Sequence, residues 1–431
     1  MKNAQGTRIA MVSLGCPRNT VDSELILGRL KNKGYVVSRL AEADVALVNT
    51  CAFIQDAKAE SVDAILDLVE LKKQGKLKKI IVCGCLPQRY GDELQKELPE
   101  VDAFMGRVSL NHGHTRFPLT PRHYAYVKIC EGCINACSYC VVPKIKGKFV
   151  SLPQDSVLAQ VKALAARGAR EINVVGQDIT AYGSDTKNGT GLEKLLERML
   201  DQERSVEWFR LLYLYPSRVS DALLELIASN PRVCKYIDVP LQHISTRILR
   251  LMRRRATRQE IVKLIARIRK RVPGVAIRTS FIVGFPSETK KDFKELLDFI
   301  REARFERLGA FVYSREEDTP ACGFKGQVPE EVKAARLNEL MMLQQEVSSR
   351  VNAAFLGKTV RVLIDEPGVT PGALQPQGKN GVMSLGRTQY DAPEVDGSVW
   401  VSSRKPLAAG DFVNVKITDT LEYDLLGELT P

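Results

Sequence analysis

A short apolar strand followed by a helical stretch occurs six times between residues 121 and 315. The strand segments are AYVKIC, EINVVGQD, FRLLYLYP, YIDVPL, AIRTSFIVGF and RLGAFVYS. Successive parallel strands need long crossover connections, and these share one hand, so the repeated units curl in one direction. Six such units, against the eight of a closed barrel, predict a partial (β/α)6 barrel with its chemistry at the carboxyl ends of the strands.

The regions on either side of this repeat have different patterns. Between residues 8 and 107 the strand segments RIAMVSL, ADVALVN and KKIIVCG alternate with helical stretches, which predicts a parallel α/β domain. A long helical stretch at 329–355 leads into β-rich segments separated by Pro, Gly and Asp, which fit a small antiparallel β-barrel. We therefore expect three domains, at residues 1–120, 121–350 and 355–431.

Composition restricts the class of protein. No apolar run among the 431 residues approaches the ~20 needed to span a membrane, and the short apolar stretch 9–14 is no secretory signal. In the cytosol thiols stay reduced, so the ten cysteines favour metal ligands or packing residues over a disulfide framework. We expect a soluble cytoplasmic monomer that does not bind membranes.

The charge is unevenly distributed along the chain. The net charge of +12 favours a polyanionic partner or compartment. From Gly357 onward, however, seven Lys and Arg stand against ten Asp and Glu, a net charge of −3, which leaves +15 on residues 1–356. A domain that grips RNA is expected to be basic, whereas an acidic domain suits a basic protein partner.

Three cysteines of the first region follow its predicted strands. Cys16, Cys51 and Cys85 each fall at or just past the carboxyl end of a strand, where open α/β sheets form their ligand sites. Any one of them alone is as easily a buried core residue. Their equivalent positions predict that all three meet at one edge of the sheet.

A second group of cysteines follows the first strand of the predicted barrel, in the segment EGCINACSYC. Four thiols, from Cys130 to Cys140, are able to enclose zinc or a ferredoxin-type cluster. Three thiols, Cys133, Cys137 and Cys140, are able instead to hold three irons of a 4Fe-4S cluster and leave the fourth iron open to a small molecule. We assign Cys130 to strand packing.

The C-x3-C-x2-C spacing at the end of the first strand of a partial barrel resembles the radical S-adenosylmethionine (SAM) enzymes. The resemblance implies that the open iron binds the amino and carboxylate groups of SAM, whose reductive cleavage gives methionine and a deoxyadenosyl radical. It also implies an electron donor. Gly176, Gln177 and Asp178 lie where that family has its SAM-contacting strand end, although they match the family motif only loosely.

The first region extends the resemblance to nearly the whole chain. The segments SLGCPRNTVDSE, VNTCAFI and CGCLPQRY resemble the methylthiotransferases, and the C-terminal barrel resembles their TRAM domain. The resemblance implies two 4Fe-4S clusters, the second one held by Cys16, Cys51 and Cys85 and used to deliver sulfur. Sulfur insertion at an unactivated C–H bond needs a hydrogen abstraction beyond any side-chain acid or base, so cofactors must supply it.

Local segments favour one branch of that family. YPSRVSD, DVPLQHIS, GRTQYDAPEVDG and EYDLLGEL resemble the branch that acts on a ribosomal protein, with Leu426 standing where a Trp is expected. This implies insertion of a methylthio group at the β-carbon of an aspartate in the decoding-centre protein of the small ribosomal subunit, free or assembled. The alternatives are a transfer RNA methylthiotransferase acting on isopentenyl-adenosine and a non-enzymatic iron-sulfur protein.

The charge pattern then predicts where the partners bind. We expect the acidic C-terminal barrel to dock the basic ribosomal protein, and the Arg-rich stretch 247–271 to face nearby ribosomal RNA. The candidate protein contacts are Asp391, Glu394, Asp396, Glu422 and Asp424.

Overall fold

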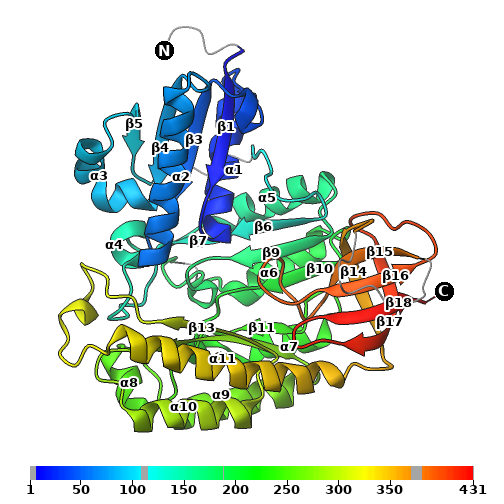
Figure 1. The fold of residues 1–431 in the computed structure, drawn as a ribbon. Coiled ribbons are helices and arrows are strands. Elements are labelled where there is room, and N and C mark those ends of the chain that lie inside the picture. The colour runs from blue at the N-terminus through cyan, green and yellow to red at the C-terminus, as the bar shows by residue number, and fades with distance from the viewer. Residues whose placement is uncertain (1–5, 108–114, 188, 370–380, 431) are drawn as a thin grey trace.

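The computed structural model describes residues 6–107, 115–187, 189–369 and 381–430 (Figure 1). In Figure 1 an N-terminal sheet stands above a central barrel, and a second, smaller barrel lies beside the central one near the C-terminus. Among the described residues, every helix is too short or too polar to cross a lipid bilayer.

The N-terminal part is a five-stranded parallel sheet with the order β2-β1-β3-β4-β5. Its strands are β1 (Arg8–Ser13), β2 (Val36–Val37), β3 (Val45–Thr50), β4 (Lys79–Gly84) and β5 (Ala103–Met105), and its helices are α1 (Pro17–Asn32), α2 (Gln55–Lys73) and α3 (Cys85–Glu97). The predicted parallel α/β fold is confirmed. Helix α3 has Pro87 in its first turn and a non-helical backbone at Tyr90, where the helix is kinked.

The central part contains the six predicted strands in chain order. They are β6 (Tyr124–Lys128), β9 (Glu171–Val175), β10 (Trp208–Leu211), β11 (Tyr236–Asp238), β12 (Ala276–Val283) and β13 (Arg307–Val312). They form two parallel three-stranded sheets. Backbone hydrogen bonds from Cys234 N to Phe209 O and from Leu214 N to Asp238 O, both 2.9 Å, join the two sheets. The predicted partial barrel is confirmed.

Helices cover the outside of this barrel (Figure 1). They are α5 (Gln154–Ala166), α6 (Leu192–Gln202), α7 (Asp221–Ser229), α8 (Thr246–Leu251), α9 (Arg258–Arg271), α10 (Lys290–Ala303) and α11 (Glu330–Ala353). Capping boxes start α9 at Thr257 and α10 at Thr289. Their apolar faces and the barrel strands form one continuous core, in which Phe281, Phe299 and Phe305 pack edge to face.

The segment that connects β6 to β9 contains the second cysteine group. It contains the short antiparallel pair β7 (Cys130–Glu131) and β8 (Val150–Ser151), with helix α4 (Val142–Lys146) between them. The cysteine loop therefore lies between β7 and α4. Lys128 at the end of β6 forms an ion pair with Glu131 of β7, just before the cysteine loop.

The C-terminal part is a closed barrel with the strand order β14-β15-β16-β18-β17. Its strands are β14 (Thr359–Glu366), β15 (Val382–Thr388), β16 (Val399–Ser403), β17 (Phe412–Thr420) and β18 (Leu425–Leu429). The predicted small β-barrel is present, although β18 pairs parallel with β16. The other neighbouring pairs are antiparallel.

Buried ion pairs join the C-terminal barrel to the amino-terminal ends of the central strands. Arg387 bridges Glu171 and Asp365, while Arg210 donates from Nε to Glu171 Oε1 at 2.8 Å. Beside them, Arg307 donates from Nε to Asp391 Oδ1 at 2.9 Å. The base of the central barrel is thus closed by charged groups that are paired and removed from water.

These contacts correct the expectation for the acidic residues of the C-terminal barrel. Asp391 is buried on Arg307, and Asp396 accepts from Tyr236 Oη at 2.6 Å and from Arg278 Nε at 3.3 Å. Glu394 accepts from Tyr124 Oη at 2.8 Å. The prediction that Asp391 and Asp396 contact a ribosomal protein is wrong, because they neutralise arginines of the same chain.

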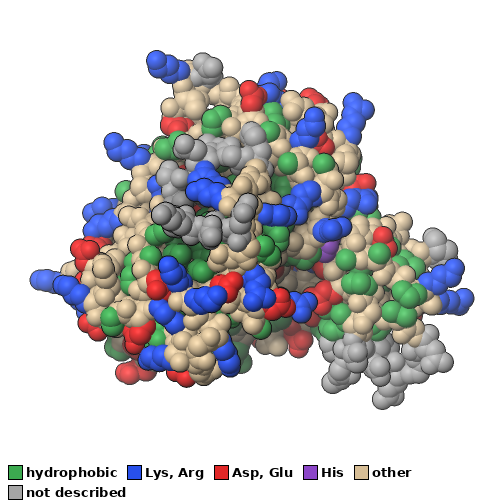
Figure 2. Space-filling view, turned by 90° about the horizontal axis from the view of Figure 1, so that it is seen from above, with side chains coloured by type: hydrophobic (Ala, Val, Ile, Leu, Met, Phe, Trp, Pro, Cys, Tyr) green, Lys and Arg blue, Asp and Glu red, His purple; other side chains and the backbone are tan. Residues whose placement is uncertain are grey.

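Within the Arg-rich stretch 247–271, some side chains have partners inside the chain, while contact of this stretch with ribosomal RNA stays a prediction. Arg247 pairs with Asp292, and Arg269 donates from Nη1 to Glu306 Oε1 at 2.8 Å. Arg254 lines an internal cavity. Figure 2 views the molecule from above and shows Lys and Arg side chains scattered over that face with Asp and Glu between them.

The buried pair of Arg307 and Asp391 gives a test of how the two barrels are held together. Asp391→Ala strands a buried guanidinium, which costs roughly 3–5 kcal/mol. We expect the C-terminal barrel to detach at lower urea concentration. Trp208 reports this step because it packs edge to face on Phe412 at 4.7 Å, and Trp400→Phe leaves it as the single Trp of the chain.

The matched control is Asp419→Ala, which removes an exposed carboxylate of the same barrel. Its urea midpoint is expected to shift by less than the equivalent of about 0.5 kcal/mol. An equal shift in the two variants contradicts the role given to Asp391.

Candidate active site

The three N-terminal cysteines meet at the carboxyl edge of their sheet. Cys16 is the residue before α1, Cys51 follows β3 directly, and Cys85 follows β4 and begins α3. All three line one cavity of about 350 Å³. Their convergence follows from the parallel sheet, in which the carboxyl ends of β1, β3 and β4 lie at one edge.

The loop after β7 brings the second cysteine group to the same cavity. Cys133, Cys137 and Cys140 line the cavity together with residues of the N-terminal part. Cys130 is absent from the lining and lies in the core, where its Sγ donates toward Asp178 O at 3.8 Å. The structure therefore brings together six of the predicted cysteines and leaves Cys130 as a packing residue.

The predicted strand end after β9 forms part of the cavity. Gln177 and Asp178 line it, whereas Gly176 lies behind them, where an added Cβ would stand 2.4 Å from Cys130 Sγ. Asp178 Oδ2 accepts 2.8 Å hydrogen bonds from Asn135 and from Arg218. This carboxylate ties the cysteine loop to the barrel strand end, so the two parts of the cavity wall keep a fixed spacing.

Burial and charge set the protonation of the N-terminal thiols. Burial alone would raise the pKa of Cys16, but the Arg18 guanidinium and the backbone N–H of Asn19 lower it overall. Burial and the negative charge of Cys16 raise the pKa of Cys51 to about 11. Burial also raises the pKa of Cys85. Of these three thiols, Cys16 is the one held toward the thiolate.

Two thiols of the second group, Cys133 and Cys140, also have a raised pKa. Burial, followed by the charge of Cys137, raises the pKa of Cys140 to about 12. Burial likewise raises the pKa of Cys133. Iron that binds Cys133 and Cys140 therefore has to displace their protons.

The two groups suit clusters better than single ions. Among the described residues, no three His, Cys, Asp or Glu side chains are arranged to hold one metal ion. Thiolates that bind different irons of a 4Fe-4S cluster lie farther apart than the ligands of one ion. Two sets of three thiols that line one cavity have the donor chemistry that would hold iron-sulfur clusters.

Ion pairs hold the two walls against each other. Asp22 on α1 pairs with Lys128 and with Lys146, both of which belong to the central part. On the other side of the cavity, Glu316 pairs with Lys58 at 2.9 Å and with Arg89 at 3.0 Å. These pairs are largely buried, so they fix the spacing of the thiol groups more firmly than exposed pairs do.

Sequence analysis missed several residues of the cavity, namely Arg18, Lys146, Tyr213 and Arg254. Arg18 had a signal, since it stands two residues after Cys16 in the segment CPRN. Tyr213 has a positive φ of 66° and gives its backbone N–H to Asp238 Oδ2 at 2.9 Å. Nothing in the local sequence predicts that strained conformation.

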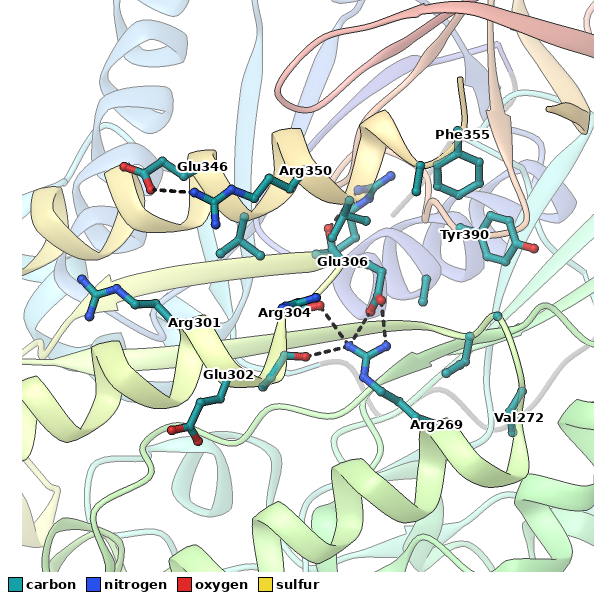
Figure 3. A pocket seen from close by; sticks show the side chains of 18 of the residues that line it. Arg269, Val272, Arg301, Glu302, Arg304, Glu306, Glu346, Arg350, Phe355 and Tyr390 are labelled. Carbon is teal, nitrogen blue, oxygen red and sulfur yellow. Dashed lines mark hydrogen bonds and ion pairs between the residues drawn. The ribbon is translucent and has the colours of Figure 1, made fainter. Parts of the chain in front are cut away.

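A larger cavity, of about 990 Å³, lies elsewhere, between the outer helices α10 and α11 and the C-terminal barrel (Figure 3). Most of the charged side chains that line it form ion pairs with one another or with nearby residues. Figure 3 shows Arg269 bonded to Glu306, and Arg350 beside Glu346. It contains none of the predicted site residues, so the smaller cavity with the six cysteines is the candidate active site.

Comparison with family models divides the chain in the same order as the three parts of the structure. A model of an uncharacterized protein family, UPF0004, matches residues 8–106. The radical SAM superfamily matches residues 127–300, and the TRAM domain matches residues 356–430.

Solved structures support the fold. The radical S-adenosylmethionine methyltransferase TsrM from Kitasatospora setae, solved with cobalamin and a [4Fe-4S] cluster, matches 74% of this chain and 74% of its own. The TM-score is 0.53 at 14% identity. At this identity the likeness concerns the fold alone.

Curated relatives match the chain from end to end. It is 43% identical over 457 residues to the ribosomal protein uS12 methylthiotransferase RimO of Pelobacter propionicus, covering 100% of this chain and 99% of that protein. It is 46% identical over 449 residues to the protein of the same name from Desulforamulus reducens, covering 98% and 99%. The chain therefore belongs to the family of the ribosomal protein uS12 methylthiotransferases RimO.

Proposed function

We propose that this chain is a radical SAM methylthiotransferase that modifies the β-carbon of an aspartate in ribosomal protein uS12, the decoding-centre protein of the small subunit. The observation that carries the proposal is the cavity lined by six cysteines from two parts of the chain. In this proposal Cys133, Cys137 and Cys140 hold the cluster that binds SAM, and Cys16, Cys51 and Cys85 hold a second 4Fe-4S cluster. The domain division 1–120, 121–350 and 355–431 belongs to the same proposal.

In this proposal the residues of the chain hold the clusters, orient SAM and shield both from water. When bound, the clusters and SAM supply the hydrogen abstraction and the methylated sulfur, which no side chain provides. Gln177 and Asp178 shape the SAM side of the cavity, with Gly176 allowing the close approach of Cys130 behind them. Tyr213 and Tyr215 contribute ring surface to the lining, which restricts water around reactive groups.

The mouth of the cavity suits a protein loop. Phe53 and Phe311 belong to the lining, yet 40% and 52% of their surfaces are exposed. They come from the N-terminal part and from β13, so they flank the entrance from two sides. Exposed aromatic side chains at a cavity rim are typical of a site that receives another macromolecule. An aspartate-bearing loop of uS12 fits this requirement, on the free protein or on the assembled subunit.

Iron content tests the cluster assignment. Fully reconstituted protein is expected to hold about eight irons, as two four-iron clusters. Replacing Cys133, Cys137 or Cys140 by Ala should remove about half of the iron and abolish reductive SAM cleavage. Replacing Cys16, Cys51 or Cys85 should also remove about half, yet leave SAM cleavage measurable.

Cys130→Ala is the control for the same iron measurement. It removes a core thiol that does not line the cavity, so iron content should stay near that of the unaltered chain. Loss of a cluster in Cys130→Ala together with its retention in Cys133→Ala would show that the ligands are assigned wrongly.

Substrate choice is tested by mass spectrometry. Loaded enzyme is incubated with SAM, a chemical reductant standing in for the electron donor, and either uS12, the small subunit or transfer RNA carrying isopentenyl-adenosine. We expect an added methylthio group on uS12 and none on transfer RNA. Modification of the transfer RNA alone would assign the chain to the alternative branch.

The role of Phe53 and Phe311 in substrate binding can be tested separately from the methylthio transfer. Replacing Phe53 and Phe311 together by Ala removes two apolar contacts for the substrate, each worth roughly 1.5–3 kcal/mol if fully buried on binding. We expect KM for uS12 to rise about tenfold or more. Leu66→Ala, on α2 and outside the cavity, is the matched control at 46% exposure. Equal KM values in all three proteins would exclude the rim from binding.

A further inference from the structure

Arg18 connects the two walls of the cavity. Its Nε donates to Cys16 Sγ at 3.2 Å, and its Nη1 donates to Gly176 O at 3.1 Å and to Gln177 Oε1 at 2.8 Å. Its guanidinium also lies 4.4 Å from the centre of the Tyr213 ring. One side chain of the N-terminal part therefore contacts both a predicted cluster ligand and the strand end on the SAM side.

This guanidinium has no carboxylate partner. No Asp or Glu of the described residues lies within ion-pair distance of Arg18, whereas its neighbours Lys128 and Lys146 share Asp22, and Lys128 also pairs with Glu131. Lys128 and Lys146 thus have carboxylate partners, whereas Arg18 has none among the described residues. Arginine does not deprotonate in proteins, so a cation enclosed in this way needs a negative charge nearby.

The available negative charge is at Cys16. The Nε to Sγ contact is a charge-assisted hydrogen bond when the sulfur is a thiolate, as it is when it binds iron. The neutral acceptors of Arg18, a carbonyl and an amide oxygen, orient the guanidinium but supply no charge. The charge of Arg18 is therefore left to be balanced by Cys16 and by whatever Cys16 binds.

We infer that Arg18 is the counter-ion of the N-terminal cluster, acting as a positioning residue that stabilises the negative charge of the cluster and its thiolates. This inference rests on the proposed function, because it assumes that Cys16, Cys51 and Cys85 hold a cluster. Reduction adds one electron to the cluster, and a neighbouring positive charge favours the reduced form. Removal of that charge therefore lowers the reduction potential of this cluster.

The test uses full-length protein in which Cys133, Cys137 and Cys140 are replaced by Ala, so that only the N-terminal cluster is present. Its reduction potential is measured by a dithionite titration followed by electron paramagnetic resonance. Arg18→Gln is expected to shift the potential to a clearly lower value. Arg18→Lys keeps the charge and loses the planar fork, so its shift should be much smaller.

Arg107→Gln is the matched control. Arg107 also crosses between the N-terminal and central parts, where it pairs with Glu131 at 3.3 Å, but it is not among the residues lining the cavity. Glu131 keeps its pair with Lys128 in this variant. We expect its potential to equal that of the parent protein.

Each outcome decides between the alternatives. A potential in Arg18→Gln equal to that of the parent would overturn the inference, and so would equal shifts in Arg18→Gln and Arg107→Gln. Loss of the cluster from Arg18→Gln with retention in Arg18→Lys supports it, since charge is then what the cluster needs. Loss from both, in folded protein, contradicts it. If the parent itself binds no iron, the cluster assignment fails rather than the role of Arg18.

Discussion

The shared cavity depends on the pairing of Asp22 with Lys128 and Lys146. Two sets of thiols can face each other only if the domains that carry them keep a fixed distance, and loops alone do not fix distances of this kind. Asp22 stands on the helix that Cys16 precedes, and Lys146 ends the helix that follows Cys140. A buried pair between these helices therefore acts directly on the spacing of the two thiol groups, and breaking it leaves an uncompensated charge.

The two ends of the central barrel have different roles. At the amino-terminal end, Arg210, Glu171 and Arg387 are paired and enclosed by the C-terminal barrel, which closes the base. The carboxyl-terminal end stays open to the thiols. A continuous series of contacts runs between the ends, from Asp396 to Arg278, to Asp238 and then to the backbone of Tyr213 beneath Arg18. The C-terminal barrel thus supports the cavity as well as closing the base.

Sequence patterns predicted the parts of this protein that depend on short-range order. The six barrel strands and the convergence of Cys16, Cys51 and Cys85 follow from strand ends that any parallel sheet brings to one edge. The ion-pair partners of the charged residues were not predictable from such patterns. Asp391 and Asp396 belong to an acidic domain, yet each is bound to an arginine distant in the sequence. Composition gives the number of charged residues in a domain. It does not give their ion-pair partners, because these depend on how the domains dock.

The same distinction applies to the thiols. Spacing identified which cysteines group together, but their protonation depends on burial and on cations brought in from elsewhere. Burial raises the pKa of Cys51, Cys85 and Cys140, so their protein surroundings favour the protonated thiol. Cys16 differs because Arg18 stands beside it. Arg18 thus places a positive charge beside the thiol that is expected to bind iron, where iron binding brings negative charge.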